Sequence, residues 1–205
     1  MTFQEATRVV ASYTTLSLSR LRGLWDAVRL VETAGVPGDL VECGCYKGGS
    51  AAMLGLARTT GRTLWLFDSF AGMPEPAEED PPEAAEKVGT SSCPAKAVRA
   101  NLSACGVGDP IQLVPGWYKD TLPWPELKQI AVLHIDCDWY ESVRKCLDAL
   151  YHNLSPGAVV QVDDYGHWAG ACKAVDDWLK AWQPNTELKV LDYTGRQFRI
   201  RGSME

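Results

Sequence analysis

Two stretches of this 205-residue chain decide its fold: Ile130-Ala-Val-Leu-His-Ile-Asp-Cys-Asp-Trp139 and Val159-Val-Gln-Val-Asp-Asp164. Each is a short, mostly apolar run, rich in β-branched residues, that ends in two carboxylates. Such a run is typical of a strand buried on both faces of a parallel sheet. In open α/β folds, ligands bind outside the carboxyl ends of such strands. We therefore expect four carboxylates to gather around one point of the sheet, those of Asp136, Asp138, Asp163 and Asp164.

Four acids that close repel one another unless a cation lies among them, so the pattern predicts a metal site. Ligand sets made of oxygen favour magnesium, manganese or calcium over zinc, which prefers nitrogen and sulfur. The seven cysteines are scattered and include no Cys-x-x-Cys pair. A zinc or disulfide framework is therefore not expected, and reduced thiols are.

The rest of the chain alternates between helix-like and strand-like patterns, which indicates parallel βαβ units in a doubly wound sheet. Residues 4–34 have helical apolar spacing and end at a Gly-Val-Pro-Gly stop. Further strands are expected at 39–43, 63–68, 111–114, 188–191 and 197–200, and further helices at 48–58, 140–150 and 170–182. We expect one domain over 1–205 that begins with an N-terminal helical segment, 1–36.

Residues 72–95 interrupt this alternation with five prolines and six acidic residues. A long irregular insert in a compact domain is either a disordered loop or a lid over an active site. Its position, between the strands at 63–68 and 111–114, opens on the ligand side of the sheet, which favours a lid.

Glycines 44, 48 and 49 follow the first expected strand and open a helix. Gly44 permits a tight turn, and the next two glycines let a ligand approach the backbone. The spacing is not that of the dinucleotide motif G-x-G-x-x-G, and no Walker sequence is present. Asp68 ends the second strand, where a carboxylate can accept hydrogen bonds from a ribose diol. An ordinary turn with an acid at a strand end remains the alternative at this point.

Five motifs occur in one order: Glu42-x-Gly44, Asp68-Ser-Phe-Ala-Gly-Met-Pro74, Gly116-Trp-Tyr-Lys-Asp-Thr-Leu-Pro123, Asp136-x-Asp138-x-Tyr140-Glu-Ser142 and Val162-Asp-Asp-Tyr165. From about residue 38 to residue 200 the series resembles the macrocin O-methyltransferase family, metal-dependent enzymes that use S-adenosylmethionine to methylate hydroxyls on antibiotics. The resemblance implies a Rossmann-like class I methyltransferase fold, whose seven-stranded, doubly wound sheet has its last strand antiparallel. The chain departs from the usual loop at the middle glycine, where Tyr46 and Lys47 stand.

The resemblance also implies roles for individual residues. Asp68 would bind the ribose of the cofactor, and Glu42, Gly44, Ser50 and Ser69 would lie around it. Gly116, Trp117 and Asp136 are our further candidates for cofactor contacts. Magnesium, with manganese or calcium as alternatives, would be held by Asp136, Asp163 and Asp164. Asp138 would be the base.

Two groups near the acidic motifs are further candidates. His167 follows the second acid pair by three residues and has an ordinary pKa of about 6.5, so it competes with Asp138 and with water for the role of base. Trp139 and Trp168 flank the acidic motifs and are candidates to stack on a sugar or aromatic acceptor. By contrast, His134 lies within a strand and is expected to be a satisfied core or face histidine.

The predicted activity is metal-dependent methylation of a hydroxyl, for which a vicinal diol on a sugar of a natural product is the expected acceptor. A hydroxyl is a poor nucleophile at neutral pH, so a cation that stabilises negative charge on oxygen and a carboxylate that takes the proton both serve this chemistry. The net charge of −6 argues against nucleic acid or an anionic membrane as partner. We expect a cytoplasmic protein, since no apolar run approaches the ~18 residues of a membrane span, and a homodimer is a further expectation.

Three other functions remain open at this point. A magnesium-dependent phosphatase or phosphotransferase would use the Asp136 and Asp138 pair, but only about 25 residues separate the acidic motifs and no suitable Ser or Thr and Lys pair lies between them. A nicotinamide dehydrogenase would explain Asp68 and leave the acids unused. A non-catalytic binding module would keep the acids at a cost in stability, because they repel one another.

Overall fold

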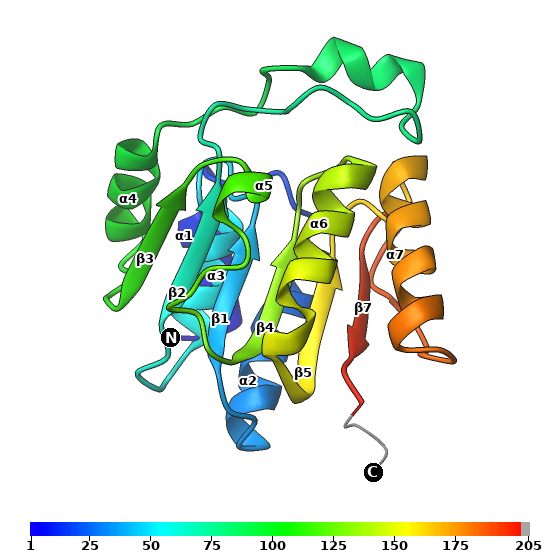
Figure 1. Cartoon of the computed structure of the whole chain (residues 1–205). Coiled ribbons are helices and arrows are strands. Elements are labelled where there is room, and N and C mark those ends of the chain that lie inside the picture. The colour runs from blue at the N-terminus through cyan, green and yellow to red at the C-terminus, as the bar shows by residue number, and fades with distance from the viewer. Residues whose placement is uncertain (202–205) are drawn as a thin grey trace.

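The computed structural model describes residues 1–201, which form one seven-stranded sheet with helices on both sides (Figure 1). The strands are β1 (Asp39–Cys43), β2 (Leu64–Asp68), β3 (Ile111–Pro115), β4 (Ile130–Ile135), β5 (Leu154–Val162), β6 (Lys189–Val190) and β7 (Arg196–Arg199). Their order is β3-β2-β1-β4-β5-β7-β6. Strands β1 to β5 pair in parallel, whereas β7 is antiparallel to both β5 and β6. The expected doubly wound sheet with an antiparallel last strand is confirmed.

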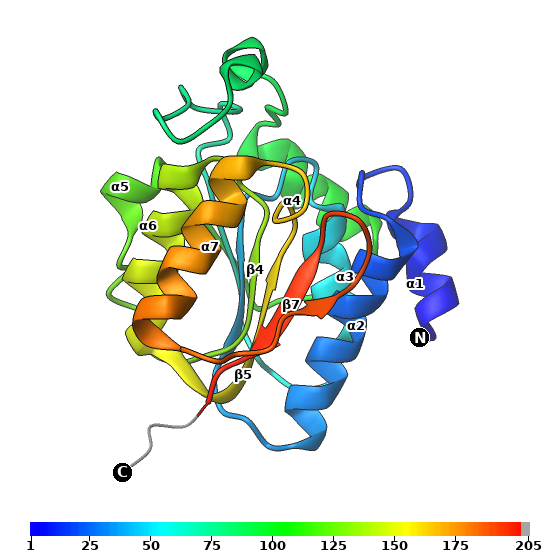
Figure 2. The same cartoon turned by 90° about the vertical axis from the view of Figure 1, so that its right-hand side faces the viewer.

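The helices form two layers, one on each face of the sheet (Figure 2). One layer contains α1 (Phe3–Val10), α2 (Leu18–Thr33), α3 (Gly49–Ala57) and α4 (Ala95–Ala104), and the other contains α5 (Tyr118–Thr121), α6 (Tyr140–Leu150) and α7 (Ala169–Trp182). Successive residues of a strand enter different layers: Leu40 packs in the first and Val41 in the second, and neither is exposed. The central strands are therefore buried on both faces, as their unbroken apolar runs predict. None of the helices within residues 1–201 is long and apolar enough to cross a membrane.

Several boundaries differ from those expected from the sequence. The helical spacing of residues 4–34 belongs to two helices, because Ser17 accepts a hydrogen bond from the backbone N–H of Arg20 and starts α2 afresh. Helix α4 was not predicted, and β5 begins at Leu154, five residues before the acidic run suggested. The insert contains a 3-10 helix, η1 (Pro82–Lys87), and a second, η2 (Tyr151–Asn153), precedes β5.

The turn between β6 and β7 is fastened to the start of α2 through Asp192. Its carboxylate accepts hydrogen bonds from the Ser17 hydroxyl, from Nε of Arg20 at 3.0 Å and from the backbone N–H of Gly195 at 2.8 Å. Burial by itself would raise the pKa of Asp192. The hydrogen bonds from Ser17 and Gly195 and the charge of Arg20 outweigh that effect and lower the pKa to about 2. The edge of the sheet and the N-terminal layer are thus joined at one carboxylate.

Replacement of Asp192 by Asn should lower the free energy of unfolding at pH 7 by roughly 2 kcal/mol. Since the folded pKa lies below the unfolded one, this contribution is complete above about pH 4 and is lost as the pH falls through the folded value of about 2. Urea unfolding of both proteins between pH 7 and pH 3 measures the difference. The control is Asp26→Asn, which removes an exposed ion pair with Arg22 and should cost at most ~0.5 kcal/mol. Equal losses in the two variants would contradict the assignment.

Candidate functional site

A cavity of about 310 Å³ lies at the carboxyl ends of the parallel strands, the end of the sheet over which the insert runs (Figure 1). Nine of the residues predicted from the sequence line it: Gly44, Asp68, Ser69, Gly116, Trp117, Asp136, Asp138, Asp163 and Asp164. Glu42, Ser50 and His167 do not. The strand-end rule has thus brought together residues that are up to 120 positions apart in the chain.

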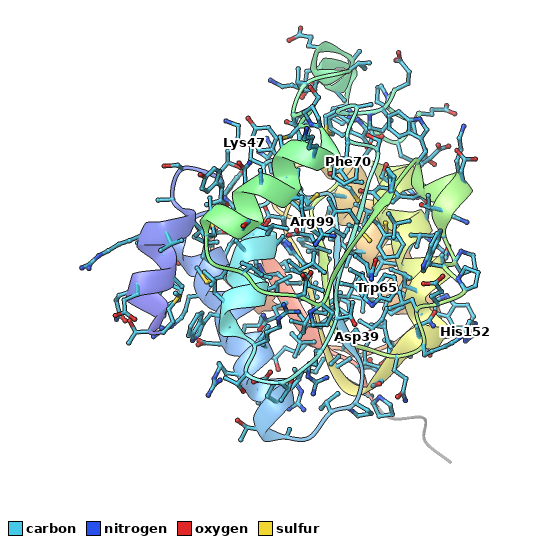
Figure 3. The ribbon with its side chains drawn as sticks, turned by 90° about the vertical axis from the view of Figure 1, so that its left-hand side faces the viewer. Asp39, Lys47, Trp65, Phe70, Arg99 and His152 are labelled. Atoms are coloured by element: carbon cyan, nitrogen blue, oxygen red, sulfur yellow. The ribbon has the colours of Figure 1, made fainter. Side chains whose placement is uncertain are left out.

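One half of the cavity is built around Asp68. One of its oxygens accepts a hydrogen bond from the backbone N–H of Cys45 and the other from that of Phe70, both at 2.7 Å. The Cys45 thiol also donates to the first of these oxygens, at 3.4 Å. These bonds fix the carboxylate between the loops that follow β1 and β2, and the oxygen bonded to Phe70 keeps a lone pair for a ligand hydroxyl. Lys47 and Phe70 lie at the end of the molecule that carries the insert, whereas Asp39, at the start of β1, lies toward the other end (Figure 3).

The loop after β1 requires glycine at one point and does without it at another. Gly44 has a φ of +85°, and a Cβ there would overlap the Asp136 carbonyl oxygen of the neighbouring strand end. Tyr46, where the usual methyltransferase loop has its middle glycine, also adopts a left-handed φ of +43°. The loop therefore takes a left-handed conformation at a residue other than glycine, at the cost of some strain.

The other half of the cavity holds the carboxylates. Ligand atoms of Asp136, Asp138 and Asp164 lie within 4.8 Å of one another, and those of His134, Asp136 and Asp163 form a second such group. Asp136 belongs to both. The four acids thus form two adjoining groups, and the predicted ligands Asp163 and Asp164 belong to different ones.

Crowding of these acids changes their proton affinity. Burial, followed by the charges of Asp163 and Asp164, raises the pKa of Asp136 well above its usual value. Burial and the neighbouring acids also raise the pKa of Asp164 well above its usual value. For Asp138, burial outweighs a hydrogen bond from Trp168 and raises the pKa to about 6. A cation placed among these groups would favour their charged forms.

The residues present fit a divalent cation of the magnesium class. The donors are carboxylate oxygens with one imidazole beside them. Among the described residues, Asp163 Oδ1 and Asp164 Oδ2 are buried and have no hydrogen-bond partner. Buried polar atoms are normally paired, so these two oxygens are available as ligands at the predicted site.

Two further side chains of the site, Arg20 and His134, make contacts with acids that were not predicted from the sequence. The guanidinium of Arg20, from α2, donates to Asp163 as well as to Asp192. His134 is fully buried, and its Nδ1 lies 2.8 Å from Glu42 Oε1 while its Nε2 lies 3.9 Å from Asp163 Oδ1. Burial opposes protonation, but the proximity of Asp163 and Glu42 raises the pKa of His134 to about 9.

Glu42 and Ser50 are buried away from the cavity surface. Glu42 has no exposed surface and pairs with His134, and Ser50 is 4% exposed within α3. Their assignment as cofactor contacts therefore stays a prediction, and their observed contacts are with the protein itself.

The remaining candidates lie beside the cavity. His167 is exposed, and its ring packs against that of Trp168 at 4.5 Å between centroids. Trp139 is 1% exposed, so the prediction that it stacks on an acceptor is wrong: its ring fills the core at the start of α6.

The insert forms part of the cavity wall and makes two hydrogen bonds to the segment that follows β4. Met73, Pro74 and Ser91 line the cavity. The Pro74 carbonyl accepts a hydrogen bond from the Trp139 indole at 3.0 Å, and buried Asp80 accepts one from the backbone N–H of Tyr140 at 2.9 Å. Both attachments are to the segment that follows β4.

Gly44→Ala should destabilise the protein by roughly 3 kcal/mol or more, because the added methyl meets a neighbouring backbone oxygen at a φ that alanine disfavours. Gly61→Ala is the matched control, since a Cβ there meets nothing within 4 Å. It should change the free energy of unfolding by no more than ~0.5 kcal/mol. Denaturant unfolding compares the two, and a Gly44→Ala protein as stable as wild type would contradict the close approach of β1 and β4.

Comparison with known proteins gives consistent relatives. A family model described as Macrocin-O-methyltransferase (TylF) matches residues 5–200. The 8-demethyl-8-(2,3-dimethoxy-alpha-L-rhamnosyl)-tetracenomycin-C 4'-O-methyltransferase of Streptomyces olivaceus is 38% identical over 195 residues, which cover 90% of this chain and 74% of that protein. The demethyldecarbamoylnovobiocin O-methyltransferase of Streptomyces niveus is 34% identical over 194 residues, with the same two coverages of 90% and 74%.

Among solved structures, the O-methyltransferase NovP superposes with a TM-score of 0.84 at 31% identity and covers 93% of this chain and 83% of its own. Both its sequence and its fold thus match along almost the whole of the present chain. The chain therefore belongs to the macrocin O-methyltransferase family and is an O-methyltransferase of the class I fold.

Proposed function

We propose that this O-methyltransferase transfers the methyl group of S-adenosylmethionine to a sugar hydroxyl of a glycosylated natural product, with the help of a divalent cation. Magnesium is the first candidate for this cation. The observation that carries the proposal is the carboxylate cluster at the ends of β4 and β5, in the same cavity as Asp68. The relative from Streptomyces olivaceus is named for methylation of a rhamnosyl tetracenomycin, which supports a sugar as acceptor.

In this proposal the cofactor occupies the half of the cavity around Asp68, whose carboxylate binds the ribose hydroxyls. Gly44, Ser69, Gly116 and Trp117 line the same cavity and would contact the cofactor. Asp136 also lines the cavity and belongs to both acid groups, so it would contact the cofactor and the cation. The cofactor brings the reactive methyl group, and alignment by the protein is worth up to ~7–11 kcal/mol of the barrier in well-oriented reactions.

Asp136, Asp163 and Asp164 would hold the cation. When bound, it supplies positive charge that lowers the pKa of a nearby hydroxyl. The unpaired Asp163 Oδ1 and Asp164 Oδ2 support this assignment. Magnesium, manganese and calcium all accept such oxygen ligands.

Asp138 is the proposed base. The acceptor oxygen attacks the methyl carbon, the carbon–sulfur bond breaks with its electron pair remaining on sulfur, and the hydroxyl proton passes to the Asp138 carboxylate. A base acts best when its pKa lies near the working pH, and that of Asp138 is raised to about 6. His167, exposed and outside the cavity lining, is the second candidate, and water is the third.

The wider assignments stay proposals. We treat residues 1–205 as one catalytic domain, with 1–36 as an N-terminal helical segment and 72–95 as a lid. The contacts of Pro74 and Asp80 support the lid. All seven cysteines are free thiols, which favours the cytoplasm, and a homodimer remains a prediction without a contact that tests it. The family assignment disfavours a phosphatase.

The test is transfer of a labelled methyl group from S-adenosylmethionine to a panel of glycosylated acceptors, with magnesium and with chelator. Wild type should lose turnover in chelator and recover it with added cation. Asp163→Asn should lower turnover by ~100-fold or more and weaken cation binding, because a charged ligand is lost, while S-adenosylhomocysteine binds within ~3-fold of wild type.

Asp177→Asn serves as the control, since it removes an exposed acid of α7 that pairs with Lys173. It should behave as wild type in both buffers. An Asp163→Asn protein that keeps wild-type turnover in the presence of chelator would exclude the metal mechanism. No transfer to any acceptor by wild type, together with no binding of S-adenosylmethionine, would exclude the function as a whole.

A further inference from the structure

The carboxylate of Asp138 receives one hydrogen bond from the residues that the structure describes. The indole Nε1–H of Trp168 donates to its Oδ1 at 2.9 Å. No other side chain or backbone group of residues 1–201 donates to either oxygen. The contact links the segment after β4 to the segment after β5, and no motif recognised in the sequence includes Trp168.

Only a few contacts determine the direction in which the Asp138 carboxylate points. Asp138 has a φ of +58°, a left-handed conformation that aspartate adopts more readily than most residues. The N–H of Trp139 donates to the Cys137 carbonyl at 2.7 Å, across this one residue. The chain therefore turns sharply between β4 and α6 and presents the Asp138 side chain to the cavity.

Trp168 is itself fixed in place. Its ring meets that of Trp139 edge to face, at 5.0 Å between centroids and 75° between planes. Its backbone N–H donates to the Asp164 carbonyl at 3.0 Å, and Trp139 is held by its bond to Pro74 of the insert. A rigid aromatic ring with one donor, packed on a second buried ring, can set the position of a carboxylate closely.

We propose that Trp168 is a positioning residue for proton transfer, which holds Oδ1 of Asp138 so that Oδ2 takes the hydroxyl proton. The proposal rests on the proposed function, because it takes Asp138 as the base. An indole N–H donates but neither accepts a hydrogen bond nor exchanges its proton in this pH range. Trp168 can therefore orient the carboxylate without competing for the proton that Asp138 receives.

A purely structural role for Trp168 makes a different prediction. Trp168→Phe keeps an aromatic ring against Trp139 and removes the N–H. If the ring alone matters, turnover stays near that of wild type. If the hydrogen bond matters, kcat falls by ~10–100-fold while KM for both substrates stays within ~3-fold, because misplacement of a reacting group by about an ångström has that effect.

A double-mutant cycle with Asp138→Asn separates positioning from general damage. Trp168→Phe should lower kcat in wild type and change it by less than ~2-fold in the Asp138→Asn protein, where no base remains to be positioned. Trp178→Phe is the matched control: Trp178 lies on α7, the helix that Trp168 precedes, and its indole nitrogen is buried without a partner in the described structure. It should leave kcat unchanged.

Wild-type kcat in Trp168→Phe, or an equal loss in both backgrounds, would overturn the proposal. An Asp138→Asn protein with normal turnover would instead refute the base assigned under the proposed function, and with it this proposal. Absence of both methyl transfer and S-adenosylmethionine binding in wild type would refute the proposed function, and with it the positioning role that rests on it. A ¹H–¹⁵N NMR spectrum tests the contact without turnover. The indole resonance of Trp168 is the one that disappears in Trp168→Phe, and it should shift in Asp138→Asn. An unmoved resonance would overturn the inference.

Discussion

The repulsion among four carboxylates at the ends of β4 and β5 is the constraint on which the rest of the site depends. Parallel pairing of these neighbouring strands forces their ends together, so the acids cannot separate without a break in the sheet. Two side chains lie against Asp163: the Arg20 guanidinium donates to its carboxylate, and the His134 imidazole lies 3.9 Å from its Oδ1. The remaining unpaired oxygens are what a divalent cation would bind.

The contacts that surround the carboxylates come from distant parts of the chain. Arg20 comes from α2 and is anchored by Asp192 in the β6–β7 turn, so the N-terminal layer and the far edge of the sheet both support Asp163, a proposed metal ligand. On the other side, Trp168 holds Asp138 and connects through Trp139 to the insert. The site is therefore assembled from segments that also stabilise the fold. The same contacts hold the reacting groups in position and pack the protein.

The sequence predicted those features that depend on local pattern. Apolar runs that end in acids located β4, β5 and their carboxylates, and Asp68 was found at the end of β2 because strand-end position is readable from a single segment. The break between α1 and α2 was missed because the apolar spacing continues across it. The role of Arg20 could not be predicted, since its partners lie more than 140 positions away and neither is part of its helix. The sequence predicted only that Trp168 stacks on the methyl acceptor, because its aromatic ring is evident from the sequence and its hydrogen bond to Asp138 is not.

The central claim, that the carboxylate cluster binds one divalent cation, is tested most directly by diffraction from crystals grown with manganese and S-adenosylhomocysteine. An anomalous difference map locates the ion without reference to activity. The account predicts one manganese peak in contact with oxygens of Asp136, Asp163 and Asp164, at ligand distances of about 2.1–2.3 Å. A map with no peak among the four acids, in crystals whose cofactor pocket is filled beside Asp68, would contradict it.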